Sequence, residues 1–151
     1  NEPEETANTL KVHPDGNTYL HTGDVGYKDE EGLIFFTSRL KRMIISSGYN
    51  IYPSFVEKIV DSHPAVLSRV VVGIPHPYKK QVPVACIVLR SNFTPSEELT
   101  NDIKEYCAKS IAKYSMPYRY EYIKSIPKTL IGKVNYRKLE EECTKKYSKV
   151  K

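Results

Sequence analysis

The chain has 151 residues, of which 40% are hydrophobic and 27% are charged, and its formal net charge is +5 at pH 7. This length suits one domain, or one domain and part of another, and the composition excludes a chain that is disordered throughout. No apolar run approaches the ~18 residues that a membrane-spanning helix needs, so the sequence predicts no transmembrane segment.

The N-terminal segment predicts a helix and a two-stranded hairpin. Residues 3–12 (PEETANTLKV) read as a short amphipathic helix, because Pro3 and the two glutamates after it suit a first helical turn. Residues 13–17 (HPDGN) have the composition of a turn, and residues 18–39 read as two strands around a DEEG reversal. Such a hairpin is too small to be stable alone, so we expect it to end a larger domain.

The next stretch, residues 37–54, reads TSRLKRMIISSGYNIYPS. It predicts a charged connector, a short buried strand, a tight turn, a second short strand and the start of a helix. Gly48 and Asn50 suit the turn because both residue types tolerate a positive φ. Taken alone, this pattern is that of an ordinary hairpin in a small α/β domain.

The remainder of the chain mixes helices and strands. Apolar residues recur at helical spacing after Pro53, namely Phe55, Val56, Ile59 and Val60. Three further strands are predicted at residues 66–75, 82–90 and 118–123. Ser96 is a predicted helix cap, and a closing helix over residues 136–147 presents Leu139 and Cys143. We therefore expect an α+β fold, a small domain with a central three-stranded sheet, flanking helices and an N-terminal hairpin.

The three cysteines, Cys86, Cys107 and Cys143, are odd in number and lack paired or metal-ligand spacing. They read as unpaired thiols, which favours a reducing, cytoplasmic setting. The first ten residues show no basic-then-apolar pattern of a secretion signal.

Charge is distributed unevenly along the sequence. Residues 1–38 hold eight acidic and two basic side chains, a net charge of −6, whereas residues 39–151 carry +11. This break suggests two bodies that meet at a connector, the second of which faces an anion. The anion can be a nucleic acid, a nucleotide or the phosphates of coenzyme A, although a solvated lysine-rich surface accounts for many of these charges.

Three motifs, in the same order and at similar distances, resemble those of the adenylate-forming superfamily, which includes acyl- and aryl-CoA ligases, luciferases and peptide-synthetase adenylation domains. They are HTGD at residues 21–24, the stretch 37–54, and PKTLIGKVNYRKL at residues 127–139. The central motif is carried by Arg39, Lys41, Gly48, Asn50 and Pro53. The resemblance implies that residues 1–38 end a large N-terminal adenylation domain, 39–41 form a hinge, and 42–151 form a mobile C-terminal domain.

The resemblance assigns nucleotide binding to Asp24 and Arg39. A carboxylate can accept bonds from both ribose hydroxyls, and a guanidinium offers a planar fork of donors. Without the resemblance, Asp24 reads as a turn residue and Arg39 as a surface arginine that pairs with Asp24 or Glu31. Lys41 matches the hinge position, where it need only absorb backbone rotation.

Ser47 and Gly48 match the segment that approaches coenzyme A in this family. A glycine lets the pantetheine arm pass close to the backbone, although Gly48 also reads as a simple turn residue. Some relatives carry lysine at the positions of Ile45 and Ser47, so any contact made by those lysines is absent here.

Lys133 matches the catalytic lysine of the family, which follows a glycine. An ammonium group placed between the attacking carboxylate and the α-phosphate of ATP lowers their repulsion in a water-poor site. Without the resemblance, Lys133 is one lysine among many. No metal-binding residue is predicted.

The sequence thus predicts the C-terminal fragment of an AMP-forming acid–CoA ligase, with its own N-terminal domain as partner. ATP, Mg²⁺, coenzyme A and a carboxylic acid would serve the complete enzyme, with nothing tightly bound to this fragment. Because the phosphate loop and acyl pocket of the family are absent from these residues, we expect the fragment alone to be inactive. The alternatives are a basic nucleic-acid-binding module, whose tyrosines would stack on bases, and a stand-alone interaction module. We expect no sequence-specific nucleic-acid binding.

Overall fold

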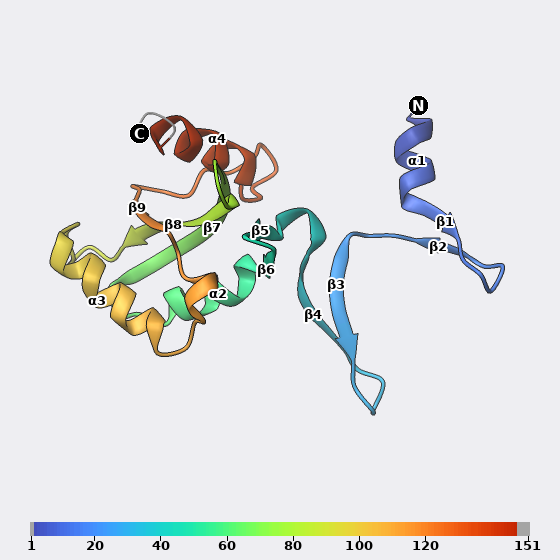
Figure 1. The fold of residues 1–151 in the computed structure, drawn as a ribbon, viewed down its shortest axis with the longest axis horizontal. Coiled ribbons are helices and arrows are strands. Elements are labelled where there is room, and N and C mark those ends of the chain that lie inside the picture. The colour runs from blue at the N-terminus through green and yellow to red at the C-terminus, as the bar shows by residue number, and fades with distance from the viewer. Residues whose placement is uncertain (1, 148–151) are drawn as a thin grey trace. The chain divides into compact units, whose positions relative to one another are not determined.

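The computed structural model describes residues 2–147, and the chain divides into two compact units, residues 1–41 and 42–151 (Figure 1). The division falls after Lys41. The assignment of residues 1–38 to a larger domain and of residues 39–41 to a hinge remains a prediction.

The first unit contains one helix and two antiparallel hairpins. Its elements are α1 (Pro3–Thr9), β1 (Leu10–Val12), β2 (Thr18–Leu20), β3 (Asp24–Lys28) and β4 (Ile34–Arg39). The helix predicted over residues 3–12 is therefore too long. It ends at Thr9 because Leu10–Val12 pairs with Thr18–Leu20 around the predicted turn.

The second unit holds the remaining helices and strands. They are β5 (Ile44–Ser46), β6 (Tyr49–Ile51), α2 (Pro53–Asp61), β7 (Val66–His76), β8 (Lys80–Leu89), α3 (Glu97–Ala108), β9 (Arg119–Tyr122) and α4 (Tyr136–Tyr147). Two short 3₁₀ helices, Leu40–Arg42 and Lys113–Ser115, complete the elements within residues 2–147, and the first of them spans the boundary between the units.

Strand β8 is the centre of a five-stranded sheet. Four of the strands follow the order β6–β5–β8–β7, and the fifth, β9, also pairs with β8. One edge of β8 pairs with β7, and the other edge is shared by two strands. Ser46 of β5 pairs with Lys80 near one end of β8, whereas residues 119–122 of β9 run parallel to residues 84–87. The α+β class is confirmed, and β7, β8 and β9 correspond to the three predicted strands, but the sheet has five strands and not the expected three. The hairpin β5–β6 adds two strands to the predicted sheet.

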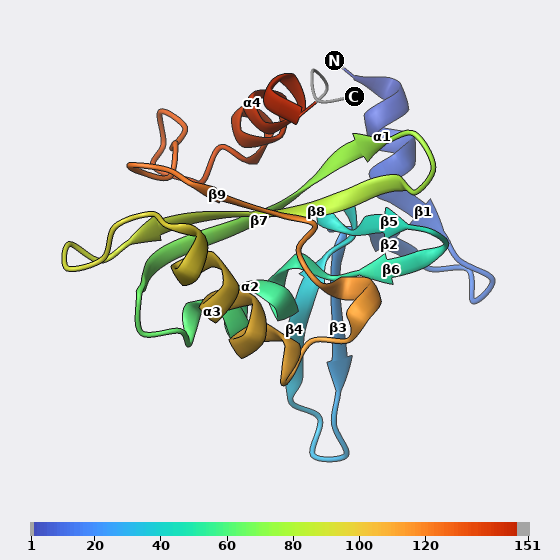
Figure 2. The same ribbon diagram turned by 60° about the vertical axis from the view of Figure 1, so that its left-hand side comes forward.

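Both faces of the sheet are covered, as Figure 2 shows, by α2 and α3 on one side and by α4 on the other. Alternate side chains of β7 and β8 point to opposite faces, which explains two separate buried clusters. The first cluster includes Val71, Ala85 and Ile87 of the sheet with Val56, Val60, Ile103 and Cys107 of the helices. The second includes Val70, Val72, Val84 and Cys86 with Leu139 and Cys143.

The helix after Pro53 forms as predicted, but one of its apolar positions faces solvent. Val56 and Val60 are buried, whereas the Phe55 side chain is 53% exposed. Phe55 precedes Val56 by one residue, and neighbouring residues on a helix point about 100° apart, so both cannot face the sheet fully.

The predicted cap of α3 is present. Ser96 has an extended backbone, and its Oγ accepts a hydrogen bond from the backbone N–H of Leu99 at 3.1 Å. We expect Ser96→Ala to lower the free energy of unfolding by about 1 kcal/mol, because a helix N–H loses its acceptor. Urea denaturation measures this loss. Ser91→Ala, an exposed serine in the preceding loop, is the matched control, and equal stability of the two variants would contradict the capping role.

None of the helices within residues 2–147 has the length and apolar character required to cross a lipid bilayer.

Candidate functional site

The β5–β6 hairpin closes through a two-residue turn made by Ser47 and Gly48. Their φ angles are 50° and 84°, as a type I′ turn requires. This conformation costs a serine about 1 kcal/mol or more, because its Cβ approaches the following carbonyl oxygen. The turn is held by β8 and the chain before it. The Ser47 N–H donates to the Lys79 carbonyl at 3.0 Å, and the Ile45 N–H donates to Gln81 Oε1 at 3.1 Å.

The space next to Gly48 is open. A Cβ atom built on Gly48 would find no atom within 4 Å apart from those of the adjoining residues. The glycine is therefore needed for its backbone angle and not to relieve a contact inside the fold. A ligand that passes the turn can approach the backbone there.

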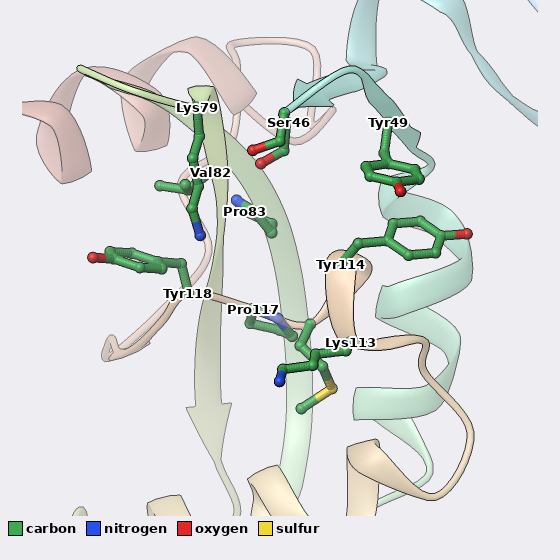
Figure 3. A pocket seen from close by; sticks show the side chains of 11 residues that line it. Ser46, Tyr49, Lys79, Val82, Pro83, Lys113, Tyr114, Pro117 and Tyr118 are labelled. Atoms are coloured by element: carbon green, nitrogen blue, oxygen red, sulfur yellow. The ribbon is translucent and has the colours of Figure 1, made fainter.

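Beside this turn lies a pocket of about 550 Å³ (Figure 3). It is lined by Ser46, Ser47, Tyr49, Lys79, Val82, Pro83, Lys113, Tyr114, Met116, Pro117 and Tyr118. The rings of Tyr49 and Tyr114 stack with their centroids 4.5 Å apart. The Lys79 Nζ lies 5.4 Å from the centre of the Tyr118 ring, toward which its side chain extends in the figure. Two ammonium groups and three phenol rings suit a ligand that combines phosphates with a flat ring.

The sequence reasoning predicted Ser47 and Gly48 here but missed Lys79 and Lys113. The paired lysines of the HPYKKQ turn were one available signal. Residues 113–118 lie beside Lys79 because β9 pairs with β8, and no local sequence pattern predicts that pairing.

Lys133 lies on a separate, projecting hairpin. Its base is closed by the Asn135 N–H, which donates to the Pro127 carbonyl at 2.8 Å, and its tip by the Thr129 N–H, which donates to the Lys133 carbonyl at 2.7 Å. Gly132, with φ 80°, completes the turn. Lys133 is exposed, and it does not line the pocket beside Gly48. Lys133 belongs to the loop that leads into α4, and Figure 2 shows this loop well apart from the β5–β6 hairpin.

In the first unit, the structure brings Asp24 and Arg39 together. They are register partners in the β3–β4 ladder, and the Arg39 Nε donates to Asp24 Oδ1 at 2.9 Å. Both side chains are substantially exposed, so each retains surface that a ligand can reach. This ion pair is the alternative that the sequence offered for Arg39, namely a surface arginine that pairs with Asp24. Their nucleotide-binding role stays a prediction, as does the hinge role of the exposed Lys41.

The three cysteines are free and buried. Burial raises the pKa of Cys107 to about 11. A hydrogen bond with Cys143, whose Sγ lies 3.6 Å away, raises the pKa of Cys86 well above that of an ordinary thiol. Cys86 and Cys107 are therefore protonated at neutral pH, which makes them packing residues and not nucleophiles.

Comparison with known proteins gives a consistent set of matches. Residues 56–133 match the family model of the AMP-binding enzyme C-terminal domain. The chain is 40% identical over 147 residues to the long-chain-fatty-acid–CoA ligase of Bacillus subtilis (strain 168), covering 97% of this chain and 25% of that protein. It is 38% identical over 142 residues to the mitochondrial acyl-coenzyme A synthetase ACSM3 of Pongo abelii, covering 93% and 23% respectively.

Among solved structures, the ATP-bound RpMatB-BxBclM chimera B1 matches with a TM-score of 0.88 at 32% identity, over 97% of this chain and 28% of that one. The chain thus spans about a quarter of the length of the curated relatives it matches. Those two relatives are named as a ligase and a synthetase, so neither the nucleic-acid-binding alternative nor the stand-alone interaction module gains support.

Proposed function

Since the chain belongs to the family of AMP-binding enzyme C-terminal domains, as its three motifs predict, we propose that it is the C-terminal part of an acid–CoA ligase. In the first step a carboxylate attacks the α-phosphate of ATP, which gives an acyl-adenylate and releases pyrophosphate. In the second step the thiol of coenzyme A attacks the acyl carbon and AMP leaves. The larger remainder of such an enzyme would bind the acid and most of the ATP.

The observation that carries this proposal is the open turn at Gly48 beside a pocket with two lysines and stacked tyrosines. Coenzyme A combines a purine ring, several phosphates and a thin pantetheine arm. Lys79 and Lys113 suit the phosphates as point charges, and the rings suit the purine. The pantetheine would pass over Gly48, where nothing blocks it.

Lys133 would serve the first step from its own hairpin. An exposed ammonium on a projecting turn can enter a site formed by another domain and place a positive charge between two anions. Asp24 and Arg39 would hold the ribose and phosphate of the nucleotide. Rotation at Lys41 would exchange the Lys133 hairpin for the Gly48 turn between the two steps.

Mg²⁺ would arrive as part of the ATP substrate. Among residues 2–147, no three His, Cys, Asp or Glu side chains are grouped as a metal site would require. A cytoplasmic location completes the proposal, and the three free thiols support it.

The test measures acid- and CoA-dependent AMP formation by the complete enzyme. Replacing Lys79 and Lys113 together by alanine is expected to raise the KM for coenzyme A about tenfold or more, because charge-assisted contacts to phosphate are lost. The KM for ATP should not change. Lys124→Ala, an exposed lysine outside the pocket, is the control. Absence of CoA-dependent AMP formation with a broad panel of carboxylic acids would refute the proposed reaction.

A further inference from the structure

Arg42 is the first residue of the second unit and directly follows the predicted hinge residue Lys41. Its guanidinium contacts three elements. Its Nη2 donates to Glu57 Oε1 of α2 and, at 3.4 Å, to the Val71 carbonyl of β7. Its Cζ lies 4.0 Å from the centre of the Tyr136 ring, at the start of α4.

The orientation of this guanidinium is fixed by its surroundings. The Arg42 and Glu57 side chains are only 20% and 13% exposed, and Glu57 Oε1 also accepts the Val71 N–H at 2.9 Å. The charge of Arg42 reaches a second residue of α4, since burial raises the pKa of Glu140 and Arg42 partly opposes that rise. Arg42 therefore joins α2, β7 and α4 at one point.

Tyr136 stands at the root of the hairpin that carries Lys133. The preceding residue, Asn135, closes the hairpin base through its N–H, and its Oδ1 accepts the Lys138 N–H at 3.1 Å, which caps α4. The start of α4 and the base of the hairpin thus share consecutive residues. Whatever holds the Tyr136 ring also holds the direction in which the hairpin projects.

We propose that Arg42 is a positioning residue that fixes the Lys133 hairpin to the chain immediately after the hinge, so that rotation at Lys41 moves Lys133 as part of one rigid body. This inference rests on the proposed function. Arginine is required because a planar guanidinium can stack on a ring while its edge donates to a carboxylate and a carbonyl. A lysine in its place keeps the charge but not this combination.

The test uses the complete enzyme and measures the two half-reactions separately. Tyr136→Leu removes the ring but leaves the Arg42–Glu57 pair, and it is expected to lower the kcat of adenylate formation about tenfold without changing the KM for ATP. Arg42→Lys is expected to do the same. Thioester formation from preformed acyl-adenylate should stay at the wild-type rate. Tyr136→Phe keeps the ring face and should restore adenylate formation. Arg137→Ala, an exposed neighbour paired with Glu141, is the control.

A double mutant distinguishes positioning from general destabilisation. If Arg42 and Tyr136 act through Lys133, then Tyr136→Leu should have no further effect on adenylate formation in a Lys133→Ala background. Multiplied losses, or equal losses in both half-reactions, would overturn the proposal.

Amide hydrogen exchange gives a readout that needs no activity, so it separates failure of this inference from failure of the proposed reaction. Tyr136→Leu is expected to speed exchange of the Asn135 N–H at the hairpin base, and Tyr136→Phe is not. Unchanged exchange in Tyr136→Leu would overturn the positioning role, whatever reaction the enzyme performs.

Discussion

Replacing Lys133 by alanine in the complete enzyme is expected to slow acyl-adenylate formation by roughly two or more orders of magnitude, the scale set by about 3 kcal/mol of transition-state stabilisation. The loss arises because the carboxylate and the α-phosphate are both anions, and no other positive side chain occupies the tip of this hairpin. The two central residues of the turn, Leu130 and Ile131, are aliphatic and exposed and offer no charge.

Pyrophosphate exchange into ATP measures this step. The Lys133→Ala enzyme, given preformed acyl-adenylate, should still make thioester, because the proposed rotation would by then have withdrawn its hairpin from the active site. Lys128→Ala removes a positive charge from the same hairpin, where Lys128 pairs with Val134, and provides the control. Equal losses for Lys128→Ala and Lys133→Ala would mean that the hairpin needs only positive charge and that the position of Lys133 has no special role.

Gly48→Leu is expected to have the opposite effect. Adenylate should form and accumulate, while transfer to coenzyme A falls by about a hundredfold, the scale on which small misplacements reduce rates. A Cβ at this position lies more than 4 Å from every protein atom outside residues 47–49, so the added side chain would project into the space proposed for the pantetheine. It also strains a backbone with φ 84°.

A second substitution separates bulk from strain. Asparagine tolerates a positive φ but branches at Cγ as leucine does, so Gly48→Asn should keep the turn and still lose most of the transfer rate if bulk is the cause. A much smaller loss than in Gly48→Leu would assign the effect to backbone strain. Single-turnover thioester formation measures both variants. If Gly48→Leu and Lys133→Ala each lose both half-reactions equally, with thermal stability intact, the two residues belong to one static site and Lys41 has no claim to be a hinge.

Much of the fold could be predicted from local patterns. The apolar strands β7 and β8, the cap at Ser96 and the closing helix with Leu139 and Cys143 all follow from sequence. The end of α1 did not, because Leu10 and Val12 fit a helix face and a strand equally well. Pairing with Thr18–Leu20 makes this segment a strand, and such pairing between separate segments cannot be predicted from the local sequence.

The candidate site was predicted only where one continuous motif carries it. Ser47, Gly48 and Lys133 each lie in such a motif. Lys113 could not be found in this way, because strand pairing places it beside the turn. Arg42 contacts Tyr136, although most of the second unit's sequence separates the two residues, so no local spacing indicates that contact.

Strand β8 sets a fixed spacing between the points where the two proposed functional segments join the sheet. The β5–β6 hairpin joins it at Lys80, and the chain that leads to Lys133 leaves it beside Ile87, whose carbonyl accepts the Ile123 N–H at 2.9 Å. At ~3.4 Å per residue, these attachment points are roughly 24 Å apart. If the second unit rotates as a rigid body, bringing the Gly48 turn to a partner surface carries the Lys133 hairpin away from it, and the reverse. Exclusion of one half-reaction during the other would then follow from the length of a strand and would need no separate regulator.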